Sequence, residues 1–247
     1  MYPLTKEFPK PLLPIAKRPI LDYIALKVAA VKELEAIIVI TNDKYYPHFL
    51  DWAKKAASYI PLSIKVINDG TKNEEGRLGA IGDINFALGQ EAFGSGDAAL
   101  IFGGDNLFQE RLDDFMDFAR RKAPQASIGL YDIGKKELAS KYGVVQLSQK
   151  SEIIDFAEKP RAPQSSLIAT CLYYIPYEKL SSFKEYTQGF KNEKDASGSF
   201  ISWLSKKEKV YGYVFKKHWY DIGDPQSYQE ADEVFANLEK EKGDGKA

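Results

Sequence analysis

The stretch Leu100-Ile101-Phe102-Gly103-Gly104-Asp105-Asn106 indicates the class of fold. The apolar run 98–102 predicts a short strand buried on both faces, and two glycines then precede Asp105. Ligands of open α/β sheets bind at the carboxyl ends of the strands. A glycine pair there lets a phosphate or sugar approach the main chain, and a carboxylate can hold a divalent metal. The structural alternative is that Asp105 or Asn106 caps a helix that begins near Arg111.

Strands and helices alternate on both sides of this stretch. Before it, the apolar pattern predicts helix, strand, helix and strand, at residues 21–32, 36–41, 47–58 and 62–67. The run 36–41 is typical of a parallel strand covered on both sides. The helix 47–58 is expected to direct Phe49, Leu50, Trp52 and Ala56 inward. After it, the pattern predicts helices at 113–122, 200–205 and 226–239 and strands at 127–131, 142–147, 153–158, 167–175 and 209–216. The last of these strands alternates as an edge strand does. The strands 142–147 and 153–158 are expected to pair as a hairpin. Such alternation is typical of a doubly wound α/β fold.

The composition limits the classes of partner. Lys and Arg total 34 and Asp and Glu total 35, so the net charge gives no attraction to nucleic acid or to a membrane surface. No apolar run reaches the ~18 residues of a membrane span. A lone cysteine, Cys171, excludes an internal disulfide and favours a reducing cytoplasm. We expect a cytoplasmic protein with one domain over residues 1–239 and a disordered tail over 240–247.

Residues 1–19 carry five prolines, at positions 3, 9, 11, 14 and 19. These exclude a regular helix or an interior strand. The apolar residues among them predict a rigid extended loop pressed against a core. Lys10 lies between two of the prolines. A lysine is most often a solvated surface residue, but a phosphate ligand needs a positioned charge, which this stiff frame would supply.

Two further segments place glycines or charges where ligands bind. Residues 68–83 form a polar loop that runs into a helix, an arrangement that suits an anion or the edge of a base. Its glycines, Gly79 and Gly82, also suit plain turns and tight helix packing. Glu158 and Lys159 end the predicted hairpin. They are either a solvated pair or ligands of sugar hydroxyls and of a phosphate.

The two aspartates of the segment 219–225 have different local roles. Asp224 precedes Pro225 and is best explained as the cap of the last helix. Asp221 has no such role and follows a strand-like aromatic segment. Cys171 is expected to be a small buried apolar residue rather than a nucleophile, because burial keeps a thiol inert.

Six segments, in this order and spacing, resemble the sugar-1-phosphate nucleotidyltransferases: YPLTKEFPKPLLPIAKRPILDY, FGGDN, YGVV, EKP, ATCLYYI and WYDIGDPQSY. The resemblance is strongest to glucose-1-phosphate thymidylyltransferases and their uridylyl relatives, and it covers residues 2–236. It implies a Rossmann-like doubly wound mixed sheet. It also implies an enzyme that transfers a nucleotidyl group from dTTP or UTP to a sugar 1-phosphate, such as glucose 1-phosphate, and releases pyrophosphate.

The resemblance also implies roles for particular residues. Asp105 and Asp221 would share a Mg²⁺ ion, and Lys10 would meet the phosphates. Lys159 would lie near the sugar phosphate, and Glu158 would hold sugar hydroxyls. The remaining substrate-binding residues would be Gly79 in a base-reading loop and Tyr142, Gly143 and Thr170 around the sugar. Many members have glycine after this threonine, where the chain has Cys171.

Three functions remain open at the level of sequence. The first is the nucleotidyltransferase, with a nucleoside triphosphate and a sugar 1-phosphate as partners. The second is a noncatalytic sugar-nucleotide sensor or regulatory subunit, because the glycine-rich GGxGTR loop that cradles the triphosphate is absent from the sequence. The third, a glycosyltransferase, would carry Asp-x-Asp where this chain has Gly104-Asp105-Asn106. The base, the sugar and the oligomeric state, homo-oligomers included, are not determined by the sequence.

We expect the natural protein to start upstream of Met1 and to include the missing strand and loop. In a doubly wound sheet that strand lies between the strands predicted at 36–41 and 98–102. Each buried backbone group left unpaired costs roughly 1–3 kcal/mol, and a strand has ~5 residues. The total cost of leaving these backbone groups unpaired is comparable to a domain's net stability of ~5–15 kcal/mol. Thermal melts and pyrophosphate release, measured for this chain and for a version extended by the upstream coding region, test the prediction. Equal stability and activity would contradict it.

Overall fold

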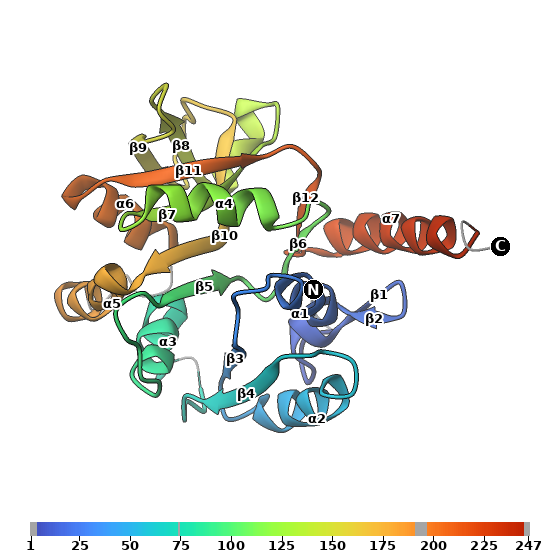
Figure 1. The fold of residues 1–247 in the computed structure, drawn as a ribbon. Coiled ribbons are helices and arrows are strands. Elements are labelled where there is room, and N and C mark those ends of the chain that lie inside the picture. Colours follow the sequence, from blue (N-terminus) through green and yellow to red (C-terminus); the bar gives the residue numbers. More distant parts are fainter. Residues whose placement is uncertain (1–3, 74, 191–196, 245–247) are drawn as a thin grey trace. The chain divides into compact units, whose positions relative to one another are not determined.

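The structure, a computed structural model, describes residues 4–73, 75–190 and 197–244 (Figure 1). The chain divides into two compact units, a division that the sequence did not predict. The first unit contains the described residues up to Asn68, the segment Gly104–Arg111 and the described residues from Lys217 onward. The second unit contains the described parts of Asp69–Gly103 and Leu112–Lys216.

The first unit alternates helices and strands as predicted. Its elements are η1 (Lys10–Leu12), β1 (Pro14–Ile15), β2 (Arg18–Pro19), α1 (Ile20–Ala29), β3 (Ala36–Thr41), α2 (Tyr46–Ala56), β4 (Ser63–Asn68), β6 (Asn106–Phe108), β12 (Trp219–Asp221) and α7 (Pro225–Asp244). Strands β3 and β4 are parallel, and β6 and β12 are antiparallel. Helix α7 ends at Asp244, so it includes the first part of the tail that was predicted to be disordered from residue 240.

The proline-rich segment behaves largely as predicted. Leu12, Leu13 and Ile15 are buried, so this segment is pressed against a core. Leu4 and Phe8 remain exposed. The segment is not wholly extended, because Pro9 precedes the 3-10 turn η1, which contains Pro11, and β1 pairs with β2 as a small hairpin. Prolines are tolerated in both features, because proline lacks a backbone N–H and neither feature is a long hydrogen-bonded ladder that would require one.

The core of the first unit is built on helix α2. Phe49, Trp52 and Ala56 are buried, as the helical periodicity predicts. Leu50 was also predicted to point inward, but 43% of it is exposed. Successive helical residues are 100° apart around the axis, so Leu50 lies beside the buried stripe and not on it. The Trp52 indole donates a hydrogen bond of 2.6 Å to the buried Asp22 carboxylate.

The second unit is a mixed α/β unit with one large sheet (Figure 1). Its elements are α3 (Gly79–Leu88), β5 (Ala98–Phe102), α4 (Asp113–Lys122), β7 (Ala126–Asp132), η2 (Lys136–Lys141), β8 (Gly143–Leu147), β9 (Ile153–Glu158), β10 (Leu167–Pro176), α5 (Tyr177–Gly189), α6 (Ser197–Lys207) and β11 (Val210–Phe215). The strand order is β11-β7-β10-β8-β9, and β5 also pairs with β10. Among the described strands of this sheet, β11 and β7 form the one parallel pair, so the expected mixed sheet is confirmed.

Strand β10 organises this sheet, since it pairs with β5, β7 and β8. The pairing of β10 with β7 changes register between Ala169 and Tyr173. The predicted hairpin is confirmed as β8 and β9, in which Gly143 pairs with Glu158. The predicted edge strand is confirmed as β11, which stands at the end of the strand order beside β7 in the described part of the chain.

Strands β3 and β5 have the predicted bounds but not the predicted burial. Among the described residues, β4 is the only strand that pairs with β3, and β10 is the only strand that pairs with β5. Every residue of β5 is half-buried, and Ile38 of β3 is 36% exposed. The prediction that both strands are buried on both faces is therefore wrong for this structure. The reason is that each strand has a neighbour along one edge only. The upstream strand stays a prediction.

None of the helices in the described part of the chain combines the length and the apolar character that crossing a bilayer requires.

The loop of the β1–β2 hairpin yields a prediction about stability. Ile15 pairs with Arg18, so Ala16 and Lys17 form a two-residue loop, with φ of 48° and 68°. Positive φ at both positions is typical of a type I′ turn, which favours glycine. A residue with a Cβ in this region costs roughly 1–2 kcal/mol, and the entropy of glycine offsets part of that gain. We expect Lys17→Gly to raise the free energy of unfolding by about 0.5–1 kcal/mol.

Urea denaturation of the Lys17→Gly protein measures this change. Lys17→Ala is the matched control, because it removes the same charge and keeps a Cβ. A gain of equal size in both variants would attribute the effect to charge and not to the backbone.

Candidate active site

The predicted phosphate lysine contacts the predicted metal ligand. Lys10 Nζ donates a hydrogen bond to Asp105 Oδ2 at 2.9 Å, and the two residues are 95 positions apart in the chain. About 30% of each side chain is exposed, so the pair is partly shielded and still open to a ligand. Pro9 and Pro11 hold the backbone on either side of the lysine. The stiff segment therefore positions this charge, as the sequence predicted.

Asn106 holds the Asp105 carboxylate in place, and Trp219 in turn holds Asn106, two roles that were not predicted from the sequence. The Asn106 amide donates a hydrogen bond of 2.8 Å to Asp105 Oδ1. Asn106 is itself buried, and its side-chain oxygen accepts a hydrogen bond of 2.9 Å from the indole of Trp219. Asp105 thus has one oxygen bound by a cation and the other bound by a fixed amide. A polar residue directly after a metal-site aspartate was the only sequence signal for Asn106.

Strand pairing brings Asp221 next to the segment that carries Asp105 and Asn106. Strand β12 pairs with β6 so that Asp221 lies opposite Asn106. The ladder continues past the strand end, because the Ile222 amide donates to the Asp105 carbonyl at 3.0 Å. Asp105 and Asp221 are therefore neighbours across one short ladder, although 115 residues separate them in sequence.

Gly104 explains why a glycine precedes the aspartate. A Cβ placed on Gly104 would lie 2.9 Å from Cγ of Pro11 and 3.4 Å from its Cβ. The first of these distances is shorter than packed side chains allow, so glycine lets the loop after β5 lie against the proline-rich turn. Pro11 adjoins Lys10 and Gly104 adjoins Asp105, so this close approach brings the two segments of the ion pair together.

Helix capping, the structural alternative to ligand binding, holds for Asp224 and not for Asp105. Asp105 does not cap a helix, because β6 follows it and α4 begins at Asp113 with Leu112 as its N-terminal flank and no side-chain cap. Asp224 does cap α7, as predicted: its Oδ1 accepts a hydrogen bond of 2.9 Å from the Ser227 amide. The first of the two carboxylates therefore has no local structural duty as a helix cap.

The donor set of Asp105 and Asp221 fits a hard divalent cation. Mg²⁺ is usually bound by one or two carboxylates together with water and substrate phosphates. The described residues contain no group of three or more His, Cys, Asp or Glu side chains that could enclose a metal alone. The Asp105 carboxylate beside Lys10, with Asp221 on the paired strand, supplies oxygen ligands of this kind.

A second cluster lies at one end of the hairpin β8–β9 in the other unit. Gly143 and Glu158 pair across the hairpin, and the Lys159 amide donates to the Tyr142 carbonyl at 3.0 Å. Four of the predicted substrate-binding residues are thus neighbours. Glu158 is half-buried and Lys159 is exposed. A carboxylate and an ammonium group on adjacent residues suit a ligand with hydroxyls and a phosphate.

The backbone of Lys159 is strained. Its φ is 46°, in the left-handed region that residues with a Cβ seldom occupy. Pro160 follows and further restricts the conformations of the residue before it. A conformation of this kind costs of order 1–3 kcal/mol and persists only where the surroundings impose it. Such strain is common at ligand-binding sites, which favours a functional explanation for the lysine.

Burial raises the pKa of the Glu158 carboxyl above its ordinary value, and the nearby Lys159 ammonium partly opposes this shift. The partly desolvated carboxylate gains by accepting hydrogen bonds, because accepting them favours its charged form. Sugar hydroxyls are donors of this kind.

Thr170 does not belong to this cluster in the way that was predicted. Its side chain is 1% exposed, and its hydroxyl donates a hydrogen bond of 2.9 Å to the Gly129 carbonyl. Thr170 lies where the register of β10 and β7 shifts, so the hydroxyl supplies a donor where the ladder is interrupted. The burial argues against direct contact with a substrate, and a structural role accounts for the residue.

Cys171 and Gly79 also have structural explanations. Cys171 is half-buried and packs against the core of the second unit, with its sulfur 3.9 Å from Ser197 Oγ. The packing against the core agrees with the predicted apolar role, but the residue is half-buried and not fully buried as predicted. Gly79 is the first residue of α3 and has a φ of 73°, which favours glycine whether or not a base binds there.

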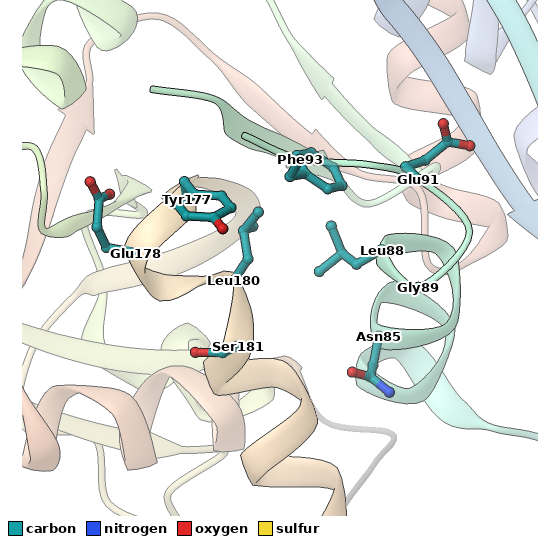
Figure 2. A pocket seen from close by; sticks show the side chains of 9 residues that line it. All are labelled: Asn85, Leu88, Gly89, Glu91, Phe93, Tyr177, Glu178, Leu180 and Ser181. Atoms are coloured by element: carbon teal, nitrogen blue, oxygen red, sulfur yellow. The ribbon is translucent and has the colours of Figure 1, made fainter. Parts of the chain in front are cut away.

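A cavity of about 420 Å³ in the second unit contains none of the predicted site residues. Figure 2 shows its lining: leucine and aromatic side chains face the space, and the carboxylates of Glu91 and Glu178 lie on opposite sides. It is lined by Asn85, Leu88, Gly89, Glu91, Phe93, Tyr177, Glu178, Leu180 and Ser181. This set contains no basic side chain, so the cavity is a poor candidate for binding phosphate.

The architecture and the comparisons identify the class of protein. The mixed α/β architecture is that of the Rossmann-like nucleotidyltransferase fold. Residues 1–237 match the family model described as "Nucleotidyl transferase", and the chain therefore belongs to this family.

Two solved structures share the fold. A protein described as a glucose-1-phosphate thymidylyltransferase of Bacillus anthracis, solved with sucrose, is 19% identical with a TM-score of 0.79, over 96% of this chain and 90% of that one. A UDP-glucose pyrophosphorylase with UDP-glucose is 20% identical with a TM-score of 0.78, over 96% and 94%.

Curated relatives are somewhat closer in sequence. A bifunctional protein GlmU of Methanocaldococcus jannaschii is 28% identical over 94% of this chain and 50% of that protein. A glucose-1-phosphate adenylyltransferase of Mycoplasma mobile is 26% identical over 92% of this chain and 61% of that protein. The chain thus spans about half to three-fifths of the length of these two relatives.

Proposed function

We propose that the protein transfers a nucleotidyl group from dTTP or UTP to a sugar 1-phosphate, with glucose 1-phosphate as the sugar substrate, and releases pyrophosphate. The observation that carries the proposal is the contact between Lys10 and Asp105, beside the ladder that brings in Asp221. In a chain of the nucleotidyl transferase family, this contact joins a phosphate-binding cation to a metal-binding carboxylate. The sugars and nucleotides named for the relatives and structural neighbours support the substrate class.

The reaction requires no covalent intermediate on the enzyme. A phosphate oxygen of the sugar 1-phosphate attacks the α-phosphorus of the triphosphate in line. The new P–O bond forms as the bond to the oxygen that bridges the α- and β-phosphorus breaks, and pyrophosphate leaves with that electron pair. The protein therefore contributes orientation and charge neutralisation, which are the main sources of catalysis in phosphoryl chemistry.

Each residue of the first cluster has one task in this proposal. Lys10 neutralises phosphate charge, and its ammonium group turns from Asp105 toward the phosphates when they bind. Asn106 and Trp219 keep the Asp105 carboxylate oriented. Asp105 and Asp221 would hold Mg²⁺. When bound, the ion supplies charge stabilisation for the pentavalent phosphorus and for the pyrophosphate that leaves.

The second cluster accounts for the sugar 1-phosphate. Glu158 accepts hydrogen bonds from the sugar hydroxyls, and Lys159 binds the sugar phosphate. Gly143 keeps the backbone opposite Glu158 free of a side chain. Pyrophosphate release measured with glucose 1-phosphate and, in turn, dTTP, UTP, ATP, CTP and GTP identifies the base. Binding of a sugar nucleotide without turnover would favour the noncatalytic sensor instead.

The proposed metal site predicts the effect of two isosteric changes. Asp105→Asn and Asp221→Asn remove one negative charge each and preserve the shape of the side chain. We expect each to lower kcat by about 10²–10³-fold, the usual cost of losing one charge-stabilising group, and to weaken Mn²⁺ binding in a calorimetric titration. Asp224→Asn is the matched control, because asparagine caps a helix as well as aspartate does. Folded Asp105 or Asp221 variants with the activity of the control would contradict the assignment.

Lys159 predicts a selective change in affinity. We expect Lys159→Ala to raise the KM for the sugar 1-phosphate about tenfold or more, because a hydrogen bond to a charged group contributes about 1.5–3 kcal/mol. The KM for the nucleoside triphosphate should change far less. Alanine keeps the Cβ, so the backbone strain at this position is the same in both proteins. Lys136→Ala, at an exposed lysine of η2, is the control. A similar rise in both KM values would indicate general damage and not a sugar-phosphate contact.

A further inference from the structure

The N-terminus of helix α6 lies against the hairpin that carries Glu158. Ser202 of α6 donates a hydrogen bond of 3.1 Å to the Phe156 carbonyl of β9, which anchors the helix beside the strand. One turn earlier in α6, Gly198 is buried and faces the Glu158 carboxylate. The helix therefore forms part of the wall around this carboxylate.

The fit between Gly198 and Glu158 leaves no room for a side chain. A Cβ placed on Gly198 would lie 1.8 Å from Glu158 Oε2 and 2.7 Å from its Cδ. Across the hairpin, a Cβ on Gly143 would lie 3.1 Å from the same oxygen. The carboxylate thus occupies space that two glycines leave open, one from α6 and one from β8.

We propose that Gly198 is a positioning residue that sets the place of the Glu158 carboxylate and thereby selects which hydroxyl of the sugar it reads. This inference rests on the proposed function, because it assigns the sugar side of that site. Gly198 acts through Glu158 and contacts no reacting atom. The ligand class is a hydroxylated hexose 1-phosphate.

The two glycines differ in what a substitution would displace. At Gly198 the atoms in the way belong to the end of the flexible Glu158 side chain, and the next contact, with Cε1 of Phe156, is 3.3 Å. Gly198→Ala should therefore fold and move the carboxylate. At Gly143 a Cβ would lie 2.5 Å from Cζ of Phe156, a buried core ring. Gly143→Ala would disturb the core and is not an informative variant.

The position of the carboxylate can be followed without any substrate. Burial raises the pKa of the Glu158 carboxyl, and Lys159 opposes this shift. Among the described residues, the hydroxyl of Tyr173 also interacts with the Glu158 carboxyl. If alanine at position 198 pushes the carboxylate outward, the desolvation decreases and the pKa falls toward its ordinary value.

The experiment compares Gly198→Ala with Gly189→Ala. Gly189 is the last residue of α5, and a Cβ there meets nothing within 4 Å, so it controls for the same chemical change in the same unit. The Glu158 carboxyl is titrated by NMR, and KM is measured for glucose 1-phosphate, for its 4-epimer galactose 1-phosphate and for the nucleoside triphosphate.

We expect Gly198→Ala to lower the pKa of Glu158 and to raise the KM for glucose 1-phosphate about tenfold, which corresponds to the loss of one well-placed hydrogen bond to a charged group. The preference for glucose over galactose should fall, and the KM for the triphosphate should stay near its original value.

A second variant separates position from stability. In the Gly198→Ala background, Glu158→Asp shortens the side chain by one methylene and makes room for the new Cβ. The double variant should therefore lose less affinity for glucose 1-phosphate than the two single changes combined. An unchanged pKa of Glu158 and an unchanged KM in Gly198→Ala would overturn the proposal. If the pKa falls but no sugar 1-phosphate binds the parent protein, the positioning stands and the proposed function fails.

Discussion

The short antiparallel ladder between β6 and β12 is the constraint on which the candidate active site depends. The chain leaves the first compact unit after Asn68, returns for Gly104–Arg111, leaves again and returns at Lys217. The two returning segments pair over three residues, which places Asp221 opposite Asn106. The buried hydrogen bond between Trp219 and Asn106 ties the same two segments through their side chains. Two distant aspartates become neighbours because backbone pairing, and not a local motif, brings them together.

Glycine serves one physical purpose in both clusters. At each position a missing Cβ lets another group approach more closely than any side chain would permit. Gly104 admits Pro11 and with it the segment of Lys10, whereas Gly143 and Gly198 admit the Glu158 carboxylate. These glycines are explained by approach and not by a positive φ. Gly79 is different, because its own φ lies in the left-handed region.

The second cluster carries features that reduce stability and that a purely structural hairpin would not need. Lys159 has a left-handed backbone before a proline, and burial disfavours the charged form of Glu158. The surrounding sheet supports both costs, because β8 lies between β10 and β9. Folded proteins often retain such unfavourable features at ligand-binding positions, where the fold holds groups ready for a ligand. Thr170 lies in the same sheet and has no such feature. Its hydroxyl donates a hydrogen bond to the Gly129 carbonyl where the register of β10 shifts.

The sequence by itself determined the local elements: the bounds of β3 and β5, the hairpin β8–β9 and the cap of α7 by Asp224 all follow from periodicity and turn residues. It also identified the family through motifs in order. The tertiary structure decided the rest: the contact of Lys10 with Asp105, the role of Asn106, the interior place of Thr170 and the approach of Gly198 to Glu158. The physical reason is that most of these depend on atoms brought together from distant positions in the chain, by strand register and by close packing. A local pattern of residue types specifies neither the partner across a ladder nor the space that a missing side chain leaves.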